Sequence, residues 1–173
     1  MRKVLSILGQ LSDDDVEWIV GRGQKVTIDA GVDLITAGQP VSQLFILLEG
    51  EVVVLLPTGA ELVRLSEGEI LGEMSLVDKS PPSASVRVTK KTVFLALDQD
   101  LLRCKMEEDA KFAANMYRAI ACFLSMRMRA TIANLGYGNA PSNLEDEVEL
   151  DEDILNKVHL AGMRFERMRQ ILG

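Results

Sequence analysis

The spacing of hydrophobic residues changes twice along this chain of 173 residues. Helical spacing over residues 2–21 predicts two short helices with a break at 9–12. From residue 24 to residue 97, apolar and polar positions alternate in short runs separated by Gly or Pro, which is typical of antiparallel strands. Helical spacing returns at Asp98, which is expected to cap a helix, and a long helix is predicted over 109–135.

This pattern predicts a mainly β fold with flanking helices. The expected architecture is an antiparallel β-roll (a double-stranded β-helix or jelly roll) with N-terminal helices, a long helix after the barrel and a C-terminal helix. We divide the chain into a domain over 1–135 and a segment over 136–173, which holds a linker, an acidic run and an amphipathic helix. Glycines punctuate the strand region at the expected turns: Gly31, Gly38, Gly50, Gly59, Gly68 and Gly72.

Composition narrows the possible partners. The net charge is −7 and the pI is about 4.8, so the chain lacks the basic surface that nucleic acids or anionic membranes attract. No apolar run reaches the roughly 20 residues of a membrane helix, and the N-terminal run is too short for a signal peptide. Cys104 and Cys122 lie in predicted helices without metal-ligand spacing, so we expect buried, reduced thiols and a cytoplasmic location.

The residues also argue against catalysis. The single histidine, His159, falls in the predicted C-terminal helix and is interpreted as a surface side chain. The barrel region contains no histidine for a metal site or a nucleophile–base pair. We therefore expect a protein that is not an enzyme and holds no metal or cofactor.

One stretch, Leu71 to Val86, combines features of an anion and sugar site. Gly72 and Glu73 precede one apolar helical turn, a polar bend and two prolines, and small hydroxyl residues follow. Helix N-termini and small-residue loops bind phosphate through unpaired N–H groups, and a carboxylate can accept a ribose hydroxyl.

The same stretch resembles the phosphate-binding cassette of cyclic nucleotide-binding domains, found in catabolite activator proteins and in the regulatory subunit of cyclic-AMP-dependent protein kinase. The resemblance implies that Glu73 accepts the ribose 2′-hydroxyl and that cyclic AMP or cyclic GMP is the ligand. It covers about residues 15–135 and ends where a winged helix would begin, so a standalone domain is expected. The ligand-binding residues that it implies are Leu71, Gly72, Glu73, Met74, Ser75, Pro82, Ser83 and Ala84.

The chain departs from this family at Pro82, because the cassette there carries an Arg that clamps the cyclic phosphate. Losing one partner of a buried charge pair costs about 3–5 kcal/mol, or roughly two to three decades of affinity. Proline also lacks an N–H donor. Strand alternation directs Arg87 to solvent, and the flexible Lys79 is a poor replacement for arginine.

Three hypotheses follow. The domain binds a cyclic nucleotide weakly and reports it through movement of the long helix; it takes another ligand, such as a cyclic dinucleotide or a neutral molecule; or it is a ligand-free interaction module. The helix over 109–135 is expected to form a homodimer, and its second half, with Arg118, Arg127 and Arg129, is expected to reach solvent. The C-terminal helix either packs on its own domain or docks an unknown downstream protein.

Overall fold

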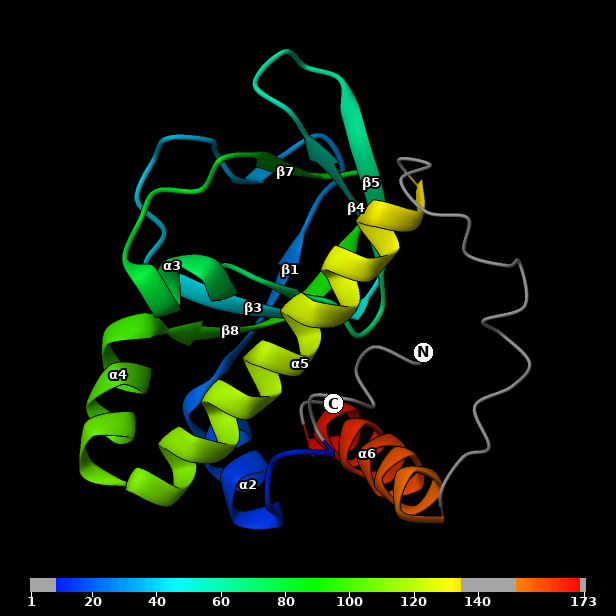
Figure 1. Ribbon diagram of the computed structural model, residues 1–173. Coiled ribbons are helices and arrows are strands. Elements are labelled where there is room, and N and C mark those ends of the chain that lie inside the picture. The colour runs from blue at the N-terminus through cyan, green and yellow to red at the C-terminus, as the bar shows by residue number, and fades with distance from the viewer. Residues whose placement is uncertain (1–8, 135–151, 172–173) are drawn as a thin grey trace.

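The computed structural model describes residues 9–134 and 152–171, and the acidic run predicted at 145–153 lies outside them except for its last two residues. It confirms the predicted antiparallel β-roll with flanking helices (Figure 1). One sheet has the order β1-β8-β3-β6, formed by Gln24–Ile28, Thr92–Asp98, Gln43–Glu49 and Ile70–Leu71. The other has the order β2-β7-β4-β5, formed by Asp33–Ile35, Ser85–Val88, Glu51–Leu55 and Glu61–Ser66.

Strands β3 and β8 lie at the centre of their sheet and are buried on both faces. In β8, Phe94 and Ala96 point into the roll, whereas Leu95 and Leu97 point to the helices outside it. The same alternation holds in β3, where Phe45 and Leu47 face the roll interior. This double burial explains why these two strands read as near-continuous apolar runs.

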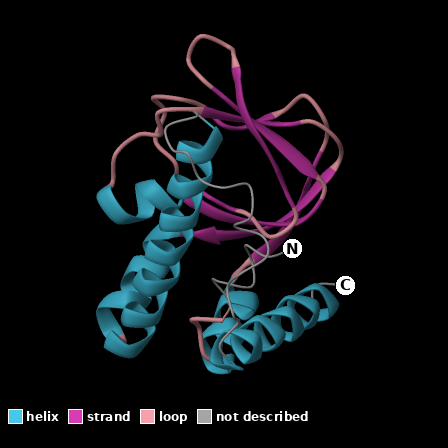
Figure 2. Ribbon diagram, turned by 45° about the vertical axis from the view of Figure 1, so that its right-hand side comes forward, coloured by secondary structure: helices cyan, strands magenta, loops and turns pink. Residues whose placement is uncertain are grey.

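The helices cover the outer face of this sheet (Figure 2). Helix α2 (Asp13–Arg22) begins with a capping box between Ser12 and Asp15. Helix α4 (Gln99–Glu108) is capped by Asp98, and the long helix α5 spans Ala110–Asn134. Asn115 of α5 donates to Asp15 of α2 over 2.8 Å, which fixes these two helices together.

The six glycines expected at turns all have positive φ. Gly50 shows why one of them admits no side chain, since a Cβ there would lie 2.3 Å from the Thr92 hydroxyl oxygen. The expectation of buried cysteines is wrong for Cys104, which is exposed on α4, and Cys122 is half-buried; both are free thiols. Neighbouring residues of a helix point to different sides of it. The apolar residues beside Cys104 in the sequence therefore do not place its thiol in the core.

Helix α6 (Glu152–Ile171) packs on α2 of its own chain, which is the first of the two readings of the C-terminal helix. Ala161, Phe165 and Met168 join the core cluster that also holds Val16 and Val20 of α2. Arg164 donates to Asp13 and to the Leu11 carbonyl, both over 2.6 Å. The division of the chain at residue 135 stays a prediction.

Because Met168 is fully buried, we expect Met168→Ala to lower the free energy of unfolding by about 2–5 kcal/mol through the cavity that it leaves. Met163 lies on the same helix with its side chain 56% exposed, so Met163→Ala is the matched control and should change stability by less than about 0.5 kcal/mol. Urea unfolding curves measure both. Equal stability of the two variants would mean that α6 does not belong to the core.

Candidate functional site

The predicted cassette lies at one edge of the first sheet, between β6 and the return strand β7. Gly72 follows β6 with φ of 85° and is the N-cap of α3 (Glu73–Asp78). A Cβ at Gly72 would lie 2.6 Å from the Gln43 carbonyl oxygen. Both the positive φ and this close approach require glycine at the start of the cassette.

The bend after α3 is held by short hydrogen bonds. The Ser75 hydroxyl donates to the Ser80 carbonyl over 2.7 Å, and the Ser80 N–H donates to the Asp78 carboxylate over 2.9 Å. Lys79 caps α3 in the left-handed conformation with φ of 60°. Beyond the bend, the Pro82 carbonyl accepts a hydrogen bond from the Gly38 N–H over 2.8 Å. These hydrogen bonds fix the conformation of the cassette from within.

Two side chains of α4 fasten the cassette to the helical layer. Gln99, which is fully buried, donates to the carbonyls of Gly72 and Gln43 over 3.0 and 3.3 Å. Arg103 donates to the Ser75 carbonyl over 3.1 Å and to the Gln99 side-chain oxygen over 2.8 Å. These hydrogen bonds connect α3 directly to α4.

The central feature of the site is an ion pair between Glu73 and Arg127 of α5. The Arg127 Nη1 donates to the Glu73 Oε1 over 2.6 Å, and its Nη2 lies 3.5 Å from the Glu69 carboxylate. The guanidinium carbon also lies 4.6 Å from the centre of the Phe123 ring. Arg127 thus reaches back from the long helix and joins two carboxylates near the cassette.

This position corrects the expectation that Arg127 lies in solvent. Its side chain is only 28% exposed, and the two carboxylates are almost fully buried. The apolar face of α5 carries it inward, since Phe123 and Arg127 are four residues apart and lie on one face of the helix. By contrast, Arg118 and Arg129 are exposed, as expected.

Burial of Glu73 changes the pKa of its carboxyl group. Removal of the carboxylate from water raises the pKa of Glu73 above its usual value, and the adjacent Arg127 guanidinium offsets part of this increase. Sharing of one guanidinium between two buried carboxylates is consistent with this direction. A raised pKa means that the negative charge of Glu73 is costly in this position.

The other predicted site residues differ in how far they are buried. Leu71 and Ser75 are buried, and the Ser75 hydroxyl is engaged within the cassette. Met74 is 54% exposed and turned to solvent. Pro82 and Ala84 are half-buried, and Ser83 is exposed. Whether these residues contact a ligand stays a prediction.

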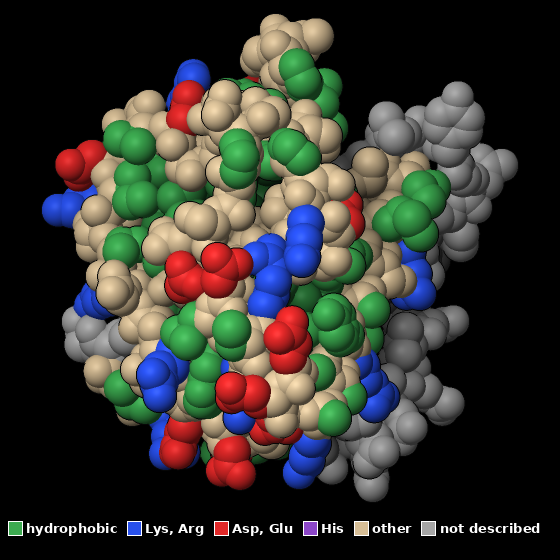
Figure 3. All heavy atoms as spheres, turned by 90° about the vertical axis from the view of Figure 1, so that its left-hand side faces the viewer, with side chains coloured by type: hydrophobic (Ala, Val, Ile, Leu, Met, Phe, Trp, Pro, Cys, Tyr) green, Lys and Arg blue, Asp and Glu red, His purple; other side chains and the backbone are tan. Residues whose placement is uncertain are grey.

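The remaining cations near the cassette are engaged elsewhere or exposed. Arg87 is directed to the outside of the roll, as predicted, and pairs with Asp33 over 2.7 Å. Arg103 is committed to α3 and to Asp100. Lys79 is exposed. In Figure 3, Lys, Arg, Asp and Glu side chains intermingle on the face that carries α3 and α4.

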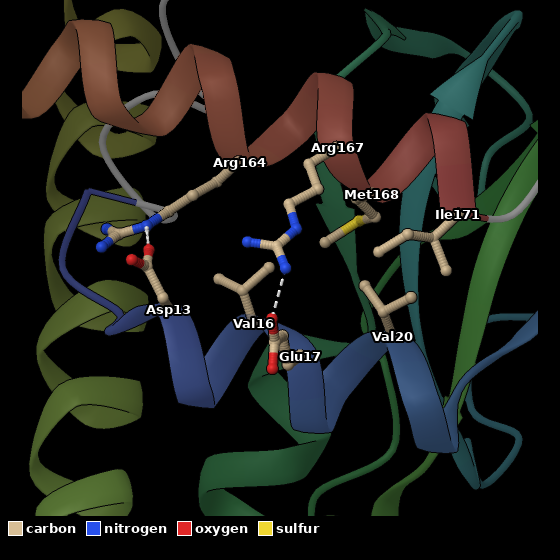
Figure 4. A pocket seen from close by; sticks show the side chains of 8 residues that line it. All are labelled: Asp13, Val16, Glu17, Val20, Arg164, Arg167, Met168 and Ile171. Carbon is tan, nitrogen blue, oxygen red and sulfur yellow. Dashed lines mark hydrogen bonds and ion pairs between the residues drawn. The ribbon is translucent and has the colours of Figure 1, made fainter.

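A shallow hollow lies outside the cassette and runs along the seam between α2 and α6 (Figure 4). Val16, Val20 and Met168 line it, and the pairs Arg164–Asp13 and Arg167–Glu17 cross the seam beside it. These ion pairs and the apolar lining indicate a packing seam between helices.

Sequence reasoning missed Glu69, Gln99, Arg103 and Arg127. Each acts through a partner distant in sequence, and the Arg127–Glu73 bond spans 54 residues. The one signal was an arginine within an otherwise apolar helix face. Over the described residues, no group of His, Cys, Asp and Glu is placed to hold a metal ion, and no helix is long and apolar enough to cross a bilayer.

The fold and the cassette together define an antiparallel β-roll whose sixth strand leads into a glycine-started cassette, and comparison with known proteins identifies its family. Residues 25–109 match the family model of the cyclic nucleotide-binding domain, and this part of the chain belongs to that family. A cyclic nucleotide-binding domain from Methylobacillus flagellatus KT superposes with a TM-score of 0.70 at 24% identity, covering 81% of this chain and 85% of that one.

Two curated relatives place similar sequence within longer proteins. Glutaminase 2 of Bradyrhizobium diazoefficiens is 29% identical over 130 residues, which are 75% of this chain and 21% of that protein. A CRP-like cAMP-activated global transcriptional regulator of Mycobacterium tuberculosis is 26% identical over 116 residues, which are 65% of this chain and 50% of that protein. The chain thus spans a fifth to a half of these relatives.

Proposed function

We propose that this domain is a regulatory sensor that binds cyclic mononucleotides weakly or with altered ligand choice. The ligand would lie against the predicted ligand-binding residues of the cassette, which we call the cradle. The observation that supports this proposal is the cassette itself, in which Gly72 starts α3 with a positive φ and Glu73 is buried. By the resemblance to the family, Pro82 takes the position of the phosphate-binding Arg. In this proposal Glu73 accepts a ligand hydroxyl and Ser83 faces the phosphate. The role is regulatory and not catalytic.

The proposed signal passes through the Glu73–Arg127 pair. A ligand hydroxyl that bonds to Glu73 changes the hydrogen bonding of the carboxylate that holds Arg127, and Arg127 belongs to α5. Gln99 and Arg103 provide a parallel connection from the cassette to α4. Occupancy of the cradle would therefore alter the position of the helices that follow the roll.

Calorimetric titration with cyclic AMP and cyclic GMP tests this function. The proposal expects a saturable heat with a Kd in the high micromolar to millimolar range, which Glu73→Ala abolishes. Absence of heat at millimolar concentrations of both ligands, together with unchanged amide chemical shifts of the cassette, would refute it.

A second candidate function is a ligand-free interaction module that dimerises through α5. The observation that favours it is an exposed apolar stripe on this helix. Tyr117, Met128 and Ile132 are 51%, 61% and 43% exposed, and their spacings of eleven and four residues bring them to one helix face. A helix that buries one face against the roll and leaves a second apolar face outside suits a helix pair between two copies.

If α5 forms a dimer, Met128→Glu should dissociate it, because a carboxylate would be buried at the centre of the interface. Sedimentation velocity should then change from a dimer to a monomer. Arg129→Glu is the matched control, since Arg129 is exposed at the adjoining position. A monomeric parent protein at 100 micromolar or more, a concentration of the order that weak dimers require, would exclude this function.

A further inference from the structure

The charges around the cassette point to a ligand class, an inference that rests on the proposed function. We infer that this cradle selects an uncharged, hydroxyl-bearing ligand of the nucleoside type over an anionic cyclic nucleotide. Such a ligand is favoured by the charged groups that are buried near the cassette and by the partners that the cations there already have.

Two buried carboxylates provide the negative charge near the cassette. Glu73 and Glu69 are 3% and 4% exposed, and both contact the guanidinium of Arg127. Arg127 also donates to the Ile70 carbonyl over 3.2 Å. One positive charge is therefore divided between two carboxylates and is not available to a phosphate.

Among the side chains that the structure describes near the cassette, no cation is left to pair with a phosphate. Pro82 provides neither a charge nor an N–H donor. Arg103 is bonded to α3 and α4, Arg87 pairs with Asp33 outside the roll, and Lys79 is exposed on the bend. An anion that enters beside the Glu73 carboxylate would lose its hydration and meet a like charge, without a buried cation in return.

The groups that remain suit a neutral ligand with hydroxyls. Arg127 bonds to Glu73 through Oε1, so the other carboxylate oxygen can accept a hydroxyl donor. The Arg127 Nε is buried and has no hydrogen-bond partner in the described structure. A buried donor of this kind is stabilised by any neutral acceptor that reaches it, such as a hydroxyl oxygen or a ring nitrogen. A furanose diol with an attached base offers both functions.

The test compares adenosine and guanosine with cyclic AMP and cyclic GMP by calorimetry on the full chain. We expect the nucleoside to bind about tenfold or more tightly than its cyclic phosphate, because the phosphate would be desolvated beside the Glu73 carboxylate without a cation. Pro82→Arg should reverse this order, because it adds a cation at the phosphate position. Pro82→Gln, which adds length and donors without charge, should retain the preference for the nucleoside.

The possible outcomes test the ligand class, the sensor function and the role of charge separately. Equal or tighter binding of the cyclic nucleotide to the parent protein would overturn the ligand class and leave the proposed sensor function intact. No saturable binding of any of the four ligands at millimolar concentration would overturn both. Pro82→Gln that reverses the order as Pro82→Arg does would show that charge is not the cause. Thermal unfolding of each variant comes first, and Pro82→Lys replaces Pro82→Arg if the latter fails to fold.

Discussion

Pro82→Arg should raise the affinity for cyclic AMP by about two to three decades. A guanidinium at this position would form a charge-assisted, bidentate contact with the cyclic phosphate, and breaking such a buried pair costs about 3–5 kcal/mol, which at 1.4 kcal/mol per tenfold gives this range. The rest of the cassette is already ordered by Gly72, by the Ser75–Ser80 bond and by Gln99. The measurement is calorimetric titration of the parent protein and the variant under one salt condition.

Pro82→Ala is the control that separates removal of the ring from addition of the charge. It restores an N–H donor without a cation, so we expect a gain of less than about tenfold. The backbone carbonyl at position 82 accepts a hydrogen bond from the Gly38 N–H. Proline, arginine and alanine can each maintain this bond, because it uses only the backbone. An arginine variant that folds like the parent but gains no affinity would mean that the cradle has a different shape from that of its family.

Arg127→Met should destabilise the protein by about 3–5 kcal/mol near neutral pH, because it leaves the buried Glu73 and Glu69 without their shared guanidinium. The loss should shrink in acid. Glu73 has a pKa above its usual value in the folded state, so its contribution to stability is largest below the unfolded pKa and is lost as pH rises through the folded pKa. Removal of Arg127 raises that folded pKa further.

Urea unfolding at pH 5 and pH 8 measures this effect, and we expect the deficit of Arg127→Met to be clearly smaller at pH 5. Arg129→Met is the matched control on the same helix and should be nearly neutral at both pH values, since Arg129 is exposed. In the double variant Glu73→Gln with Arg127→Met, part of the stability should return because one buried charge is gone. A deficit that is equal at both pH values would contradict a carboxylate origin.

The sequence predicts the roll well because its signals are local. Alternation assigned Arg87 to the outside of β7, and the turn glycines fall at positive φ, where only a residue without Cβ is unstrained. The apolar runs of β3 and β8 cannot be distinguished from helix by periodicity alone. Their short length and, after β3, the turn residue Gly50 favour strands.

The electrostatics of the site could not be predicted in the same way. The Glu73–Arg127 pair joins two elements whose approach depends on how α5 crosses the roll, and no local pattern encodes that crossing. The prediction of a buried Cys104 was wrong for a related reason. Which side of a helix is exposed depends on how the helix packs against its neighbours. The resemblance to the family located the cassette, whereas only the structure showed which cations are already engaged.

The central claim is that the cassette keeps the Gly72 and Glu73 of its family but has Pro82 in place of the phosphate-binding Arg. A crystal structure of Pro82→Arg with cyclic AMP tests it most directly. The account predicts the ribose hydroxyl on the Glu73 carboxylate, with the phosphate between Ser83 and the introduced guanidinium. Cyclic AMP bound away from Glu73, or a cradle filled by its own side chains in the folded variant, would contradict it.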